Sequence, residues 1–119
     1  SMFDGLKSNN AKWDVIGMSL YPTAGNWADL NTQCIANMSD MISRYGKDIM
    51  ICEVGMPVSD SSACKSFIQD LIAKSKSIPN NKCLGVFYWE PECYGDWSGY
   101  KLGAFNAEGQ PTVALDAFK

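Results

Sequence analysis

Three nearly continuous apolar runs recur about every 35 residues along the chain. They span residues 13–22, 47–57 and 83–91, and a proline stops each of them. A continuous apolar run, as opposed to an alternation of apolar and polar positions, is typical of a strand in a parallel sheet whose two faces are both covered. The pattern therefore predicts three parallel strands that are buried on both faces.

Between these runs, apolar side chains return with the period of a helix. The pattern predicts one helix over residues 28–45, which ends where Gly46 adopts a left-handed conformation. A second helix is predicted over residues 62–77, with Pro79 beyond its end. A last short helix is expected to open at Pro111, because proline is well suited to a first helical turn.

The order of the predicted elements is that of a parallel α/β fold. Residues 3–10 match the end of an earlier helix, and the remainder reads β–α–β–α–β–loop–α. A strand and helix of about 35 residues is the length of one unit of a (β/α)8 barrel, in which eight units take roughly 250 residues. The 119 residues are therefore expected to form a single domain over 1–119 that is a segment of an incomplete barrel. A small open three-stranded α/β layer is the alternative.

The amino-acid composition limits the catalytic groups and ligands that the chain could use. The chain has no histidine, which excludes Ser-His-Asp and Cys-His catalysis within it, as well as a His-ligated zinc site. The net charge of −3 disfavours nucleic acid and anionic membrane surfaces as partners. Phosphate-binding glycine motifs are absent and the Asp and Asn residues are scattered, so we expect no cofactor and no metal. Catalysis would have to use carboxylates, thiols, Lys or Tyr.

Five cysteines, an odd number, occur without a Cys-x-x-Cys motif. Cys52 and Cys83 lie in apolar runs and are expected to be small core residues. Cys34, Cys64 and Cys93 lie nearer to helix ends or loops, where one disulfide is feasible.

Glu53 is the most informative polar residue. It directly follows the apolar residues 49–52 inside the second run. A buried carboxylate costs several kcal/mol unless it is hydrogen-bonded or paired. In parallel α/β folds, ligands bind at the carboxyl ends of the strands. Glu53 is therefore a candidate functional carboxylate, with a satisfied structural glutamate as the alternative.

Polar and aromatic residues end the other two runs as well. Ser19 and Tyr21 end the first run, and Trp89 and Glu90 end the third. Two carboxylates at one mouth would perturb each other's pKa. Aromatic rings at such a place offer flat faces that suit the C–H faces of sugars. Six rings lie at or beyond the strand ends: Tyr21, Trp27, Trp89, Tyr94, Trp97 and Tyr100.

Three segments, in this order and spacing, resemble the C-terminal part of glycoside hydrolase family 53, the arabinogalactan endo-β-1,4-galactanases. They are residues 14–22 (DVIGMSLYP), residues 44–48 (RYGKD) leading to Glu53, and residues 85–91 (GVFYWEP). The ending over residues 102–118 is similar too. The resemblance implies strands six, seven and eight of a (β/α)8 barrel of retaining glycosidases.

The resemblance also implies roles for individual residues. Glu53 matches the nucleophile at the end of strand seven, and Trp89 matches the tryptophan that floors the sugar subsite next to the scissile bond. Ser19 and Tyr21 match the Ser-x-Tyr-Pro pattern of strand six. Glu90 and Trp97 are added because they lie at or beyond the end of the third apolar run, so the predicted substrate-binding residues are Ser19, Tyr21, Trp89, Glu90 and Trp97. The substrate would be β-1,4-galactan, and the location secreted, periplasmic or at the cell surface.

The chain departs from the family's pattern in several places. Residues 23–26 (TAGN) replace an aromatic-rich stretch, and residues 54–57 (VGMP) replace Thr-Ala-Tyr-Pro. The short loop after strand seven argues against the calcium site of some members. The family's acid/base glutamate, in an Asn-Glu pair on strand four, would lie upstream of Ser1. We therefore expect the isolated chain to be inactive.

Other interpretations stay open. The chain would otherwise be a non-catalytic carbohydrate-binding or self-assembling barrel fragment, or part of a related cellulase or mannanase. Because three parallel strands leave two open edges, which must be covered or paired, a homo-oligomer is expected.

Overall fold

Three parallel strands form one sheet in the order β1-β2-β3 in the computed structural model, which describes residues 1–119. The strands are β1 (Val15–Leu20), β2 (Asp48–Val54) and β3 (Cys83–Tyr88). β1 pairs with β2 and β2 pairs with β3, both in parallel. Each connection between neighbouring strands carries a helix, as the apolar pattern predicts.

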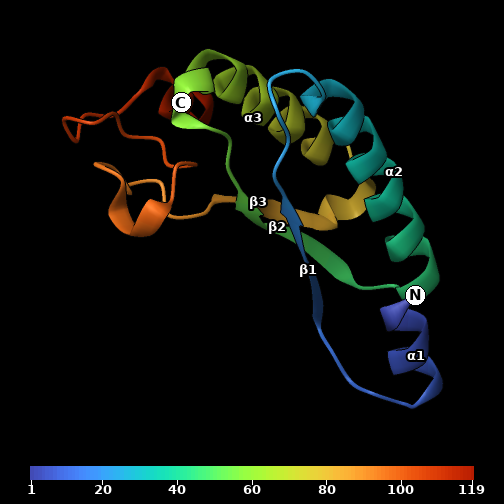
Figure 1. Cartoon of the computed structure of the whole chain (residues 1–119). Helices are drawn as coiled ribbons and strands as arrows, with labels where there is room; N and C mark the ends of the chain where they lie inside the picture. The colour runs from blue at the N-terminus through green and yellow to red at the C-terminus, as the bar shows by residue number, and fades with distance from the viewer.

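Two long helices, α2 (Trp27–Tyr45) and α3 (Ser61–Lys76), lie on the same side of the sheet (Figure 1). α2 ends at Gly46, whose φ of 67° is the left-handed conformation expected there. The apolar residues of both helices pack against the helix-facing side chains of the strands. The largest fully buried members of this core are Ile16, Met38, Ile49, Ile51, Met56, Phe67, Ile68 and Leu71.

The remaining helical segments are short. α1 (Met2–Ser8) precedes β1, and its Phe3 ring lies 5.8 Å from the rings of Trp13 and Tyr45. None of the helices is both long enough and apolar enough to cross a lipid bilayer. Single turns and short runs of 3-10 helix cover Val58–Asp60, Pro79–Asn81, Trp97–Gly99 and Val113–Phe118.

The predicted last helix is wrong in its start and type. It is a 3-10 helix over Val113–Phe118, and the Thr112 hydroxyl accepts the Ala114 N–H at its beginning. Pro111 instead forms an isolated β-bridge with Phe105. A residue held in extended backbone by that bridge is not available for a helical turn, so the helix begins later.

The expectation that the strands are buried on both faces is also wrong for this chain. The helix-facing residues Ile49 and Ile51 are fully buried, whereas Val15, Leu84 and Phe87 are 39%, 51% and 57% exposed. Both long helices pack on one face, so the apolar residues of the other face have no covering element here. We call this second surface the uncovered face.

The predicted burial of the cysteines is wrong: the two that were expected in the core are only partly buried, and two that were expected near helix ends or loops are buried. Cys34 and Cys64 are buried within α2 and α3, and burial raises the pKa of both thiols. Cys52 and Cys83 are only partly buried, because their strands are covered on one face. All five thiols are free, so the structure contains no disulfide.

Candidate functional site

Glu53 lies at the carboxyl end of β2 and is bound by a residue that follows β1. Tyr21 Oη donates a hydrogen bond to Glu53 Oε2 at 2.9 Å. The register between the two strands shifts after Met18, and this irregularity brings Ser19 beside Glu53. The two strand ends thus bring Ser19, Tyr21 and Glu53 together at one edge of the sheet.

The position of Tyr21 is constrained from two sides. A Cβ atom at Gly55 would lie 3.0 Å from Tyr21 Cε1 and 3.2 Å from the Leu102 carbonyl oxygen, so only glycine leaves room for the ring. Burial raises the pKa of Tyr21, and the hydrogen bond to the Glu53 carboxylate raises it further. Tyr21 therefore stays protonated as a donor throughout the neutral pH range.

Trp89 continues the path of β3 beyond the last residue of the strand. Its backbone N–H donates to the Val54 carbonyl at 3.0 Å, which ties it to the end of β2. Its side chain is 45% exposed. The residue lines a shallow apolar groove of about 330 Å³ on the uncovered face, together with Met50, Cys52, Phe87 and Tyr88.

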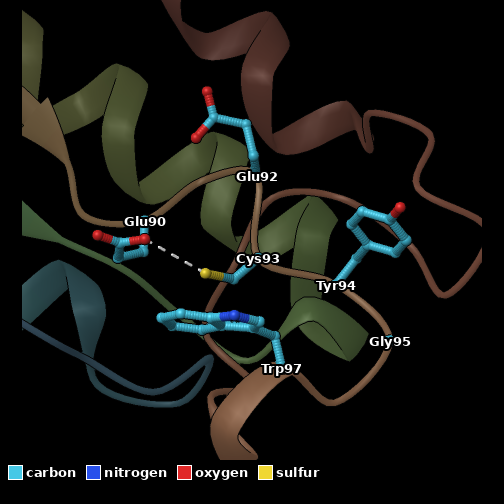
Figure 2. Close-up of a pocket in the computed structure, with 6 residues that line it drawn as sticks. All are labelled: Glu90, Glu92, Cys93, Tyr94, Gly95 and Trp97. Atoms are coloured by element: carbon cyan, nitrogen blue, oxygen red, sulfur yellow. Dashed lines mark hydrogen bonds between the residues drawn. The ribbon is translucent and has the colours of Figure 1, made fainter.

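A second hollow lies in the segment that follows. It has a volume of about 480 Å³ and is lined by Glu90, Glu92, Cys93, Tyr94, Gly95 and Trp97 (Figure 2). We call it the Trp97 pocket. Cys93 Sγ donates to Glu90 Oε2 at 3.4 Å, and burial followed by the Glu90 carboxylate raises the pKa of the Cys93 thiol. Figure 2 shows the Trp97 indole extending beneath Cys93 toward Glu90, while Glu92 points away.

Glu90 has an unusual backbone. Its φ of 48° lies in the left-handed region that residues with a Cβ rarely adopt. Such a conformation costs roughly 1–2 kcal/mol and is concentrated at functional sites and tight turns. The turn places the Glu90 carboxylate on the Trp97 pocket.

The predicted site residues fall into two groups. Ser19, Tyr21 and Glu53 form the first, and Glu90 and Trp97 line the same pocket in the second. Trp89 lies on the chain between them, and no direct hydrogen bond joins Glu53 to Glu90.

The sequence did not single out Tyr100, Glu92 or Cys93 for the site. Tyr100 Oη donates to the Trp89 carbonyl oxygen at 3.3 Å, while Glu92 and Cys93 line the Trp97 pocket. Tyr100 carried one signal, its place among the aromatic residues beyond the strand ends. Tyr100 and its partner Trp89 both lie in the irregular segment after β3, where no helical or strand period indicates which residues meet.

The arrangement offers one hydrogen-bonded carboxylate at a strand end, with exposed indole faces on the neighbouring segment. No group of three His, Cys, Asp or Glu side chains is placed to hold a metal ion. A carboxylate that is held in this way is suited to act as a nucleophile or to accept hydrogen bonds from the hydroxyl groups of a sugar.

Sequence comparisons link this chain to a family. The chain matches the family model described as glycosyl hydrolase family 53 over residues 1–66 and 58–118. A probable arabinogalactan endo-β-1,4-galactanase A of Neosartorya fischeri is 28% identical over 109 residues, which cover 75% of this chain and 30% of that protein. An arabinogalactan endo-β-1,4-galactanase A of Emericella nidulans is 28% identical over 93 residues, which cover 66% of this chain and 26% of that protein. The chain thus spans less than a third of the length of these two relatives.

Solved structures share the fold. A structure from a study of two fungal β-1,4-galactanases superposes with a TM-score of 0.76 at 20% identity, covering 98% of this chain and 42% of that one. A catalytic domain of family 53 from Ignisphaera aggregans gives a TM-score of 0.68 at 22% identity, with coverage of 99% and 41%. The fold is therefore that of a (β/α)8 barrel segment, as predicted. With the family model matching both halves of the sequence, the chain belongs to glycosyl hydrolase family 53.

Proposed function

We propose that this chain supplies the nucleophile side of the active site of a retaining endo-β-1,4-galactanase, which hydrolyses β-1,4-galactan in arabinogalactan. The observation that carries the proposal is the Glu53 carboxylate at the carboxyl end of β2, which accepts the Tyr21 hydroxyl at 2.9 Å. The exposed Trp89 follows the neighbouring strand and is tied to the end of β2. The names of the family relatives indicate the substrate class.

In this mechanism the chain's residues have distinct tasks. A carboxylate oxygen of Glu53 attacks the anomeric carbon, and the bond from that carbon to the leaving sugar oxygen breaks. The Tyr21 hydroxyl holds the carboxylate in its attacking orientation, and the Trp89 indole carries the sugar ring. Ser19, Glu90 and Trp97 would bind hydroxyl groups and rings of the neighbouring sugar units.

Retaining hydrolysis also requires a second carboxyl group, ~5–5.5 Å from the first, that protonates the leaving oxygen. The 119 residues contain no Asn-Glu pair, and Glu90 accepts a hydrogen bond from Cys93 and not from any residue next to Glu53. We therefore propose that residues 1–119 are one domain, the C-terminal part of the catalytic domain, and that the acid/base comes from outside it. The purified chain is expected to release no reducing sugar from β-1,4-galactan, and robust turnover would contradict this.

An activated sugar tests the nucleophile separately. A fluorosugar galactobioside with a dinitrophenolate leaving group needs no acid, because that leaving group departs unprotonated. Glu53 should displace it and form a stable glycosyl ester, which mass spectrometry of the proteolysed chain locates. Glu53→Gln should remain unlabelled, whereas Glu108→Gln, at an exposed residue outside the Trp97 pocket and the groove beside Trp89, should be labelled like the unaltered chain. Labelling of another carboxylate would reject Glu53 as the nucleophile.

A second candidate is a non-catalytic carbohydrate-binding module. The exposed rings favour it, because Trp89 and Trp97 are 45% and 56% exposed. Titration with galacto-oligosaccharides separates the two functions. A binding module should lose affinity in Trp89→Ala and keep it in Glu53→Gln, whereas an active-site half should be weakened by both changes.

The open sheet edges support a further proposal on assembly. β1 and β3 each have one unpaired edge, and both carry exposed apolar residues. We expect copies of the chain to pair or bury these strands in a homo-oligomer.

A further inference from the structure

The segment after β3 is fastened to the strand end from which it departs. We call residues 89–104 the β3 exit segment. Tyr88 Oη donates to the Leu102 carbonyl oxygen at 3.0 Å, and the Ala104 N–H donates to the Pro91 carbonyl oxygen at 2.7 Å. The last residues of the segment therefore return to its beginning and hold a fixed position beside the candidate site.

Tyr100 lies just before Leu102 and Ala104, the two residues that return to the beginning of the segment. Its hydroxyl donates to the Trp89 carbonyl oxygen at 3.3 Å, across eleven residues of chain. Burial raises the pKa of Tyr100, the neighbouring Tyr21 lowers it, and the carboxylates of Glu53 and Glu90 contribute to the rise. The Tyr100 phenol is thus bound to the backbone of Trp89, the residue that directly follows β3.

We propose that Tyr100 is a positioning residue, which holds the Trp89 carbonyl and so helps to set the Trp89 indole relative to the Glu53 carboxylate. This proposal rests on the proposed function. A sugar ring that lies on the indole must present its anomeric carbon to Glu53, and a displacement of about 1 Å in such an alignment costs about a hundredfold in rate. The Trp89 N–H is held by the Val54 carbonyl, and the Tyr100 hydroxyl holds the other side of the residue through its carbonyl.

Removal of the hydroxyl tests the proposal. In Tyr100→Phe the ring remains and the Trp89 carbonyl loses its hydrogen bond, while the Trp89 N–H keeps its bond to the Val54 carbonyl. The indole N–H resonance of Trp89 in a nitrogen-15 spectrum should shift and broaden. The rate of Glu53 labelling by the activated galactobioside should fall about tenfold, or about 1.4 kcal/mol. Tyr100→Leu, which also lacks the hydroxyl, is the second variant and carries the same expectations.

Tyr45→Phe is the matched control. It also removes a hydroxyl that is hydrogen-bonded, here to Asp4, but Tyr45 ends α2 and packs against Phe3 and Trp13. This variant should leave both the Trp89 resonance and the labelling rate unchanged. A merely structural contribution of Tyr100 would lower the unfolding temperature without moving the Trp89 resonance.

The two readouts separate the proposal from the function on which it rests. An unaltered chain that is never labelled would count against the proposed function, while the Trp89 resonance would still report on Tyr100. A Trp89 resonance that is identical in folded Tyr100→Phe, Tyr100→Leu and the unaltered chain would overturn the positioning role.

Discussion

Gly103 shows how one residue without a side chain holds the β3 exit segment in place. A Cβ atom at this position would lie 2.3 Å from the Cys93 carbonyl oxygen and 3.3 Å from the Pro91 carbonyl oxygen. Both atoms belong to the backbone and cannot rotate away. Gly103→Ala should therefore lower the free energy of unfolding by about 1–3 kcal/mol, measured by urea denaturation.

Gly25→Ala is the matched control for this change. The nearest atom to its added Cβ is Thr23 Oγ1 at 3.9 Å, an ordinary contact distance. Its unfolding free energy should stay within about 0.5 kcal/mol of that of the unaltered chain. Equal losses in the two variants would show that close backbone approach at Gly103 is not the cause.

Gly55 tests the same principle at the candidate site. A Cβ atom at this position must push on the Tyr21 ring at 3.0 Å, and the Tyr21 hydroxyl would then leave the Glu53 carboxylate. We expect Gly55→Ala to slow the labelling of Glu53 by the activated galactobioside about tenfold, or about 1.4 kcal/mol. An unchanged labelling rate in the folded variant would mean that the Tyr21 hydrogen bond is not needed to orient Glu53.

Among the elements, the contact between α2 and α3 depends on a buried polar residue. Asn31 of α2 is fully buried, and its Nδ2 donates to the Phe67 carbonyl at 3.0 Å and to Asp70 Oδ2 at 2.9 Å. Asn31→Ala removes both hydrogen bonds between the helices and leaves a space in the buried contact, so it should lower the free energy of unfolding by about 2 kcal/mol. Thr32→Ala, on the exposed side of the same helix, should change it by less than about 0.5 kcal/mol. Similar values for the two variants in urea denaturation would argue against the buried contact.

Asp70 gives the same contact a dependence on pH. Burial raises the pKa of its carboxyl, but hydrogen bonds from Lys74 and Asn31 outweigh burial and hold the pKa below its ordinary value of 3.8. Because the folded state favours the ionised form, the stabilisation is fully present above the ordinary value. It is lost as the pH falls through the lower folded pKa.

Measurements on Asp70→Asn over a range of pH check the direction of this effect on stability. Between about pH 5 and about pH 2, the unaltered chain should lose more unfolding free energy than Asp70→Asn, which does not titrate. The free energies come from urea denaturation at each pH. A greater loss in Asp70→Asn would show that burial outweighs the hydrogen bonds.

Local rules explain which elements could be predicted from the sequence. Gly46 marks the end of α2 because its left-handed backbone favours glycine, and the apolar period identifies the helices. Pro111 misled the prediction because a bridge to Phe105, which is a contact across a loop, determines its backbone. Burial of Cys34 and Cys64 depends on which helix face meets the sheet, and the sequence near a single cysteine does not show this.

The same reasoning applies to the candidate site. Glu53 stands out in the sequence because a carboxylate interrupts an apolar strand, and the structure gives it a hydrogen-bond partner in Tyr21. Whether Glu53 is the nucleophile stays a prediction. The contacts of Tyr100 and Gly103 arise from the return of the β3 exit segment, a path that has neither a helical nor a strand period.

For the molecule as a whole, the candidate site lies at the margin of a sheet that is covered on one side only. α2 and α3 cover one face (Figure 1). The groove that Trp89 lines with Met50, Cys52 and Phe87 opens on the uncovered face. Apolar composition on both faces of the strands matches a barrel, in which the inner face packs against other strands. We therefore expect the uncovered face to be the part of this chain through which copies associate.

Two substitutions on β3 test this tendency. Leu84 and Phe87 are 51% and 57% exposed on an edge strand, so lysine at both positions removes apolar surface and adds charges that oppose edge pairing. Light scattering after size exclusion should give the unaltered chain a mass above 13.1 kDa, and Leu84→Lys with Phe87→Lys should return it to that monomer mass. Val113→Lys, at a residue that is 45% exposed outside the sheet, should keep the larger mass. A clean monomer for the unaltered chain at every concentration would show that neither the open edges nor the uncovered face drives association.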